Sequence, residues 1–120
     1  MRIFICHSTV SNYKQELYAP LKNSELAKKH ELIFPYDPHG TESIKDIIRD
    51  CDLVLAEVSN PTFEQGLQLG WASASYVSTV CFYKTGTQVS PFLKDVTEIP
   101  YPYDSIEDMS KKIQEVADAL

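Results

Sequence analysis

Basic residues are scarce in this chain. Its 120 residues contain 11 Lys and Arg against 17 Asp and Glu, which gives a formal net charge of -6 and a pI near 4.9. Binding to a nucleic-acid backbone depends on a basic face and on counterion release, so this composition argues against DNA or RNA as a partner. A small anion remains compatible with it, because the N-terminus of a helix can bind one without a basic patch.

Long apolar runs are also missing. No stretch approaches the roughly 20 apolar residues of a membrane-spanning helix. The opening residues MRIFICHSTV are too short for a signal peptide and are followed at once by polar residues. We therefore expect a cytoplasmic protein with no membrane partner.

Cysteines are few and widely spaced. Cys6, Cys51 and Cys81 are odd in number, and each lies in or beside an apolar run rather than in the pattern of a metal site. We expect buried free thiols in a reducing compartment, with no metal and no cofactor. Repeats, low-complexity tracts and Pro/Gly/Ser linkers are absent too, so residues 1–120 are expected to form one domain.

Short apolar runs rich in β-forming residues alternate with helical patterns along the chain. Strands are expected at 2–6, 31–35, 53–58, 79–83 and, more weakly, around 98–101. Helices are expected from Ser11 to Leu26 with a kink or break at Pro20, from Ser43, at about 62–76, and at 105–120. Strands separated by helices need right-handed crossovers, which predicts a flavodoxin-like (Rossmann-like) doubly wound parallel α/β sheet of about five strands.

The ligands of such sheets bind beyond the carboxyl ends of the strands, which directs attention to residues 6–11, 58–62 and 84–90. Thr62 and Gln65 have the spacing of a capping box, so a helix is expected to begin at Thr62. Its free N–H groups would favour a phosphate or carboxylate, although a plain capped helix fits the same pattern.

Two faces of this helix carry distinct residues. Gly66 and Gly70 lie one turn apart and would let the helix approach the sheet or a partner helix closely. Glu64, Gln68 and Trp71 share another face. If the glycines face inward, Gln68 lies at a pocket-lining edge within reach of a ligand at the strand ends.

The stretch CDLVLAEVSNPTFEQGLQLGWA (51–72) resembles the signature of the nucleoside 2-deoxyribosyltransferase superfamily, and most closely its 2'-deoxynucleoside 5'-monophosphate N-glycosidase branch. In that branch a strand reading D, three hydrophobic residues and A-E-V precedes a Pro-Ser turn and Gly-x-Gly-x-Glu-Leu-Gly-x-Ala. Weaker likeness extends over most of the chain, including KTGTQVSPFL (84–93). The family's enzymes break an N-glycosidic bond with a glutamate that attacks or stabilises the anomeric carbon, and pass the sugar to another base or to water.

The resemblance places the family's catalytic glutamate at Gln68, whose neutral amide is a very poor nucleophile, so activity is expected to be weakened or lost. It implies hydroxyl ligands for a 5'-phosphate at Ser8, Thr62 and Ser90, with Ser90 supplied by the neighbouring subunit of a homodimer. Ser59 belongs to the same implied binding site.

Further positions differ from the family or add to it. Gly66 keeps one of the family's glycines in the implied binding site, whereas Phe4 replaces a tyrosine and Ile44 stands about where an aspartate holds the sugar. Glu64 replaces the other glycine, either as a relocated catalytic carboxylate or as an acid favoured by the helix dipole.

Two histidines are placed near the expected rim of the site. His7 follows the first strand directly and could act as a general acid or hydrogen-bond a base. His39, in a Pro-His-Gly turn, could line the same mouth. Histidines in such positions are more often solvated loop residues than functional ones.

Three functions remain open. One is an N-glycosidase (a hydrolase) or deoxyribosyltransferase with residual or altered activity, acting on a small-molecule nucleoside or nucleotide. Another is a nucleotide-binding pseudoenzyme that keeps the phosphate site. The third is a TIR-like module for NAD processing or signalling, because FICHS and SNPTF also resemble that family's first two boxes. A receiver domain is disfavoured, since Glu57 and Val58 stand where its aspartate would end the central strand.

Overall fold

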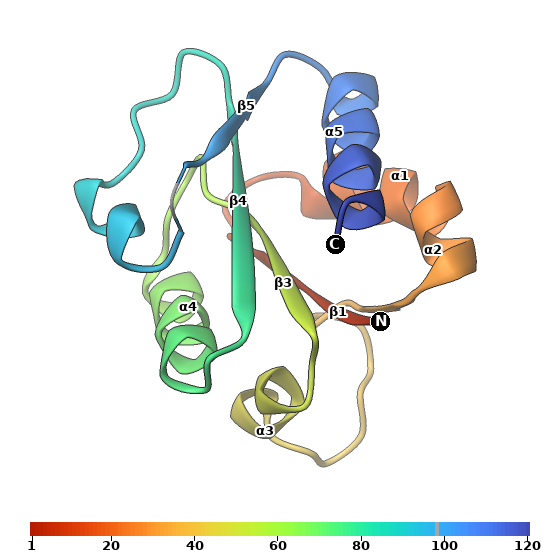
Figure 1. Ribbon diagram of the computed structural model, residues 1–120, viewed down its shortest axis with the longest axis vertical. Helices are drawn as coiled ribbons and strands as arrows, with labels where there is room; N and C mark the ends of the chain where they lie inside the picture. The colour runs from red at the N-terminus through yellow and green to blue at the C-terminus, as the bar shows by residue number, and fades with distance from the viewer. Residues whose placement is uncertain (98) are drawn as a thin grey trace.

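The computed structural model describes residues 1–97 and 99–120 and contains one parallel sheet in the order β2-β1-β3-β4-β5 (Figure 1). Its strands are β1 (Arg2–His7), β2 (Glu31–Ile33), β3 (Leu53–Glu57), β4 (Ser78–Lys84) and β5 (Tyr101–Tyr103). This order confirms the predicted flavodoxin-like, doubly wound α/β fold. Residue 98, in the weak strand expected around 98–101, lies outside the described residues.

Helices cover both faces of the sheet because every central strand is apolar on both sides (Figure 1). One face packs against the π-helical turn η1 (Lys14–Tyr18), α1 (Ala19–Lys22), α2 (Glu25–Lys29) and α5 (Ile106–Asp118). The other packs against α3 (Ile44–Arg49), α4 (Phe63–Ala74) and the 3-10 turn η2 (Pro91–Asp95). No helix among the described residues is long and apolar enough to cross a membrane.

The first helical region differs from the expected helix broken at Pro20. The π-helical turn η1 runs into α1 without a break, with Tyr18 and Ala19 both in the right-handed helical conformation, so Pro20 lies just past a widened turn inside one helical stretch. The break comes three residues later, where the Asn23 N–H and Nδ2 both donate to the carbonyl of Ala19, and the Ser24 N–H and Oγ both donate to that of Leu21. The Ser24 N–H thus bonds three residues back instead of four, and α1 ends there.

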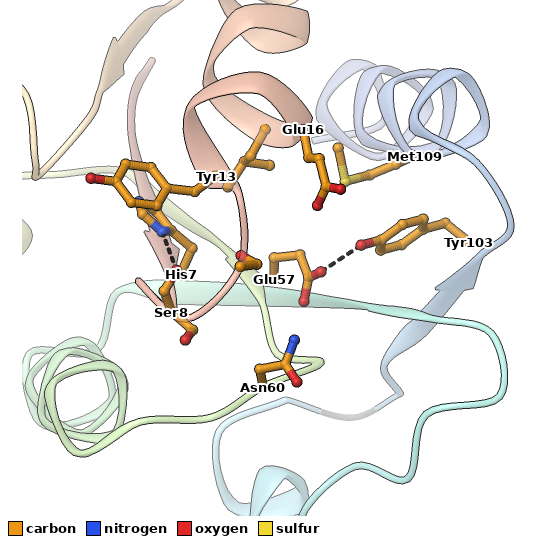
Figure 2. A pocket seen from close by; sticks show the side chains of 10 residues that line it. His7, Ser8, Tyr13, Glu16, Glu57, Asn60, Tyr103 and Met109 are labelled. Atoms are coloured by element: carbon orange, nitrogen blue, oxygen red, sulfur yellow. Dashed lines mark hydrogen bonds between the residues drawn. The ribbon is translucent and has the colours of Figure 1, made fainter.

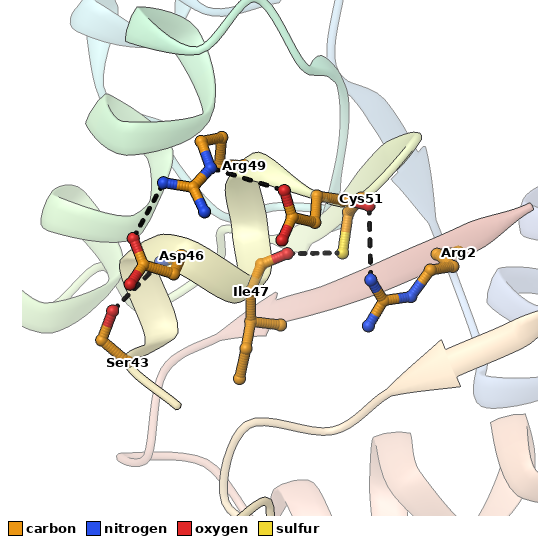
Figure 3. A network of polar contacts seen from close by, with 7 residues as sticks. Arg2, Ser43, Asp46, Ile47, Arg49 and Cys51 are labelled. Atoms are coloured by element: carbon orange, nitrogen blue, oxygen red, sulfur yellow. Dashed lines mark hydrogen bonds and ion pairs between the residues drawn. The ribbon is translucent and has the colours of Figure 1, made fainter. Parts of the chain in front are cut away.

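Ser43 caps α3 as predicted, with its Oγ accepting the Asp46 N–H (Figure 3). The C-terminal end of α3 is tied to its surroundings by Cys51 Sγ, which donates to the Ile47 carbonyl, and by Arg2, which donates to the Asp50 carbonyl. The helix that leads from β2 into β3 is therefore fixed at both ends.

All three cysteines are buried and free, as expected. Burial raises the pKa of Cys51 to about 11 and that of Cys81 to about 12, and it raises the pKa of Cys6 further still. The thiolate is the reactive form, so these thiols are chemically inert at neutral pH.

The capping box expected at the start of α4 is only half formed. Thr62 Oγ1 accepts the Gln65 N–H, but the Gln65 side chain does not return to Thr62. Its Nε2 donates instead to the carbonyl oxygen of Glu57 at 2.6 Å, and the residue is 1% exposed. The amide therefore attaches α4 to the end of β3.

The glycines of α4 do not face inward. Gly66 and Gly70 are exposed, and a Cβ at either position would meet no atom within 4 Å. The expectation that they allow close approach to the sheet is wrong, because Leu69 and Ala72 pack α4 against the other elements.

Tyr76 offers a test of stability at the C-terminal end of α4. Its φ is +59°, its side chain is 95% exposed, and Val77 N–H bonds to the Ala72 carbonyl in the bonding pattern of a Schellman motif. We expect Tyr76→Gly to raise the free energy of unfolding by about 0.5–1 kcal/mol, because glycine adopts positive φ without a Cβ clash. Urea denaturation measures the change. Tyr76→Ala keeps the Cβ, and an equal gain from it would contradict this reason.

Candidate functional site

A groove of about 390 Å³ separates α4 from the segment that follows β2. The helix contributes Glu64, Leu67, Gln68 and Trp71, and the facing segment contributes Pro35, Tyr36, His39 and Ile44. Small-molecule sites commonly have volumes of roughly 300–1,000 Å³, so the groove is large enough for a nucleoside. It brings the helix face that carries Glu64 and Gln68 together with His39 and Ile44, which the sequence had singled out separately.

Gln68 forms the buried part of this groove. It is 6% exposed, and its Oε1 has no hydrogen-bond partner among the described residues. A buried amide oxygen without a partner destabilises the folded chain by about 1–3 kcal/mol. Gln65 Oε1 and Gln114 Oε1 are also without one in the described part of the chain, but of these three residues only Gln68 lines the groove.

Glu64 lies one helical turn before Gln68 and is exposed in the groove. Burial, and next the negative charge of Glu64, raise the pKa of the Tyr36 phenol. The Tyr36 hydroxyl, which is protonated at neutral pH, is a donor in the same groove as the Glu64 carboxylate. The groove thus combines an anion, a hydroxyl donor, an amide and two aromatic rings.

His7 lies at the end of β1, outside the groove, and is 2% exposed, so the expected position at the rim is wrong. Its Nδ1 donates to the Ser8 carbonyl at 2.9 Å, and its Nε2 accepts from the Tyr18 hydroxyl at 2.6 Å. The Tyr18 oxygen accepts the Tyr36 N–H at 3.3 Å. A neutral His7 therefore links β1 to the loop that carries Tyr36.

His7 also makes stability depend on pH. Burial lowers its pKa below the ordinary value of 6.5, and its bond to Ser8 and the charge of Glu57 offset this only in part. The unfolded chain takes up the proton first, so the free energy of unfolding should fall as pH drops below 6.5 and level off only below the folded-state pKa. Urea denaturation at pH 7.5, 6.5 and 5.5 tests this. His7→Gln cannot titrate, and an unchanged slope in that variant would contradict the assignment.

A second hollow lies between the ends of β1 and β3, where the strand order reverses (Figure 2). Glu57 fills it: Oε1 accepts the Ser59 N–H and Oε2 accepts the Tyr103 hydroxyl. Burial, followed by the Glu57 contact, raises the pKa of Tyr103 well above its usual value. The remaining volume of about 20 Å³ suits a water molecule rather than a nucleotide.

The predicted phosphate hydroxyls lie at the ends of different elements. Ser8 lines the hollow at Glu57, Ser59 Oγ accepts the Lys84 N–H beside β4, and Thr62 caps α4. Each of these oxygens accepts a backbone N–H, as does Ser90 Oγ from Phe92. A hydroxyl that accepts in this way can still donate its own proton to an anion.

Ser90 and Gly66 lie on the opposite side of α4 from the groove. They line an apolar hollow of about 240 Å³ together with Val58, Pro61, Gln65, Leu69, Gly70, Phe92, Leu93 and Val96. At about 100° per helical residue, positions 65, 66, 69 and 70 point away from positions 64, 67, 68 and 71. Ser90 therefore does not line the groove at Gln68 of its own chain.

No protein-family model matches the chain, and no curated protein matches it. Solved structures match its fold. CMP N-glycosidase BcmB of Clostridium botulinum is 19% identical with a TM-score of 0.71 over 95% of this chain and 99% of that one. A conserved protein of Enterococcus faecalis V583 is 13% identical, with a TM-score of 0.69 over 97% and 98%. A 2-deoxyribosyltransferase of Bacillus psychrosaccharolyticus is 14% identical, with a TM-score of 0.59 over 92% and 90%. At these identities the likeness shows a shared fold.

Sequence reasoning missed Tyr36 as a groove residue. It lies in the turn-rich segment YDPHG, which indicates a loop but not the direction of a side chain. The bond from its N–H to Tyr18 joins residues 18 positions apart, so no local pattern could reveal it.

Proposed function

We propose that this chain binds a nucleoside or nucleoside 5'-monophosphate in the α4 groove, as a protein of the nucleoside 2-deoxyribosyltransferase and N-glycosidase type. The observation that carries the proposal is the meeting of Glu64 and Gln68 in one groove of nucleoside size. Structural neighbours whose names describe a CMP N-glycosidase and a 2-deoxyribosyltransferase support it at the level of fold. Within this group, we propose that the chain is of the deoxynucleotide N-glycosidase type.

Gln68 limits the chemistry in this proposal. Cleavage of an N-glycosidic bond passes through a positively charged, oxocarbenium-like sugar, which a carboxylate stabilises or captures covalently. An amide carries no charge and cannot do either. We therefore expect binding with little or no cleavage, in a cytoplasmic protein that needs no metal or cofactor.

Slow cleavage through Glu64 is a second candidate, favoured by the position of this carboxylate one turn from Gln68 in the same groove. Thr62 and Ser8 would bind the phosphate in either case, at the start of α4 and at the end of β1. His7 would act as a positioning residue, because both of its ring nitrogens are already bonded.

The outer face of α4 supports a homodimer in this proposal. Gly66 and Gly70 leave it open, and the largely exposed Phe92 lies in the same hollow as Ser90. Phe63, three residues before Gly66, is also largely exposed. A second copy packed here would cover apolar surface and could bring Ser90 to a neighbouring site. Sedimentation equilibrium tests this, and a monomer at micromolar concentration would contradict it.

Ligand binding and base release test the main proposal together. Thermal unfolding is followed with deoxynucleoside and ribonucleoside 5'-monophosphates, free nucleosides, deoxyribose 5-phosphate and NAD, and released base is measured by chromatography. A ligand at 100 times its Kd stabilises the fold by about 2.7 kcal/mol, enough to raise Tm by several degrees. We expect a monophosphate to raise Tm without efficient release. Failure of every nucleotide to raise Tm would contradict the proposal, and cleavage of NAD would favour the TIR-like alternative.

A further inference from the structure

The chemistry of the α4 groove is unusual for a nucleotide site because its lining contains no Lys or Arg. Its polar groups are the Glu64 carboxylate, the Gln68 amide, the Tyr36 hydroxyl and the His39 ring. A carboxylate repels phosphate, so the phosphate of a bound nucleotide belongs outside this groove. The part of the ligand that matches the groove is flat and apolar on its faces and carries N–H donors at its edge.

Two aromatic residues come from the two sides of the groove. Trp71 lies on α4 and Tyr36 on the segment after β2. The Tyr36 backbone is held by the Tyr18 hydroxyl, and its ring lies 5.2 Å from the buried His7 ring, centre to centre. A Tyr36 ring held in this way, with the Trp71 indole on the other side of the groove, can stack on a nucleobase, and such stacking contributes about 1–3 kcal/mol per base.

The edge of the base would meet Glu64. A carboxylate accepts hydrogen bonds only, so it favours an exocyclic amino group and opposes a carbonyl oxygen at the same place. Gln68 is more than nine-tenths buried, and its unpartnered Oε1 lies one helical turn further along α4, where the sugar attached to the base would meet it.

We propose that the α4 groove holds the base of its ligand between Tyr36 and Trp71 and selects bases with an exocyclic amino group through Glu64. Cytosine and adenine belong to this class, whereas uracil and hypoxanthine present a carbonyl oxygen instead. The inference rests on the proposed nucleotide-binding function, in the form in which Glu64 recognises the base and takes no part in cleavage.

The test compares two matched pairs of ligands, the 5'-monophosphates of cytidine and uridine and those of adenosine and inosine, by titration calorimetry. A charge-assisted hydrogen bond corresponds to about 10-fold to 100-fold in Kd. We expect the amino member of each pair to bind at least about tenfold more tightly. Glu64→Gln should remove most of this preference. Glu107→Gln, the same change at an exposed position of α5, should preserve it.

Trp71 provides a direct signal because it is the only tryptophan in the chain. A base stacked on the indole should quench its fluorescence in proportion to binding, and deoxyribose 5-phosphate should not. Trp71→Leu should weaken binding about 10-fold to 100-fold, and Trp71→Phe should retain most of it, because a ring remains.

The outcomes separate the inference from the proposed function. If no monophosphate binds, the proposed function fails and the inference fails with it. If all four bind with equal affinity and without quenching, the function stands and the inference is wrong. A Glu64→Gln variant that loses cleavage but keeps the amino preference would also overturn it, because Glu64 would then act on the sugar.

Discussion

Gln68→Glu is expected to raise the rate of base release from a bound nucleoside 5'-monophosphate by at least about a thousandfold, since loss of a central catalytic group typically lowers rates by three or more orders of magnitude. The new carboxylate would stand in the groove beside Glu64 and face the sugar of the bound nucleotide. Its negative charge would stabilise the cationic sugar that the Gln68 amide leaves unstabilised. Chromatography of the free base under single-turnover conditions measures the change.

Matched variants make this result specific. Gln68→Met removes the amide without adding charge and should release no more base than the unchanged chain. Adding Glu64→Gln to Gln68→Glu should leave most of the gained rate, because the new carboxylate supplies the chemistry. If Gln68→Glu binds nucleotide normally and remains as inert as the unchanged chain, the correspondence of Gln68 with the family's glutamate is wrong.

The same change of glutamine to glutamate at position 65, three residues earlier in α4, should destabilise the fold instead of adding activity. Gln65→Glu is expected to lower the free energy of unfolding at pH 7.5 by at least about 3 kcal/mol, the usual effect of an unpaired buried charge. Gln65 is 1% exposed and donates from Nε2 to the Glu57 carbonyl. A carboxylate cannot donate, so two oxygens would face each other in a space without water.

Two experiments check the role of Gln65: unfolding of Gln65→Glu at low pH, and unfolding of the uncharged variant Gln65→Met. Protonation of the new side chain near pH 5 restores an O–H donor and should recover part of the lost stability, after subtraction of the change seen in the unchanged chain. Gln65→Met leaves the Glu57 carbonyl without its donor and should lower the free energy of unfolding by about 1–3 kcal/mol, with no such recovery. Equal urea midpoints for Gln65→Glu and the unchanged chain would contradict the role assigned to this amide.

Much of the fold follows from local patterns. The apolar runs at β1, β3 and β4 and the caps at Ser43, Thr62 and Ser105 are all visible in the sequence. Hydrophobic periodicity and side-chain capping depend on residues within about four positions of one another, so they can be read without tertiary contacts. The break after α1 was misplaced at Pro20, because the chain passes Pro20 just after a π-helical turn and ends α1 only at Asn23.

The sequence by itself determined the wound α/β sheet and identified Glu64 and Gln68 as neighbours on one face of a helix. Only the tertiary structure decided which face of α4 is buried, because glycines and glutamines can each serve on either face. It likewise placed Tyr36 in the groove, buried His7 and separated Ser90 from Gln68. These placements depend on contacts between residues distant in the chain, which local periodicity cannot encode.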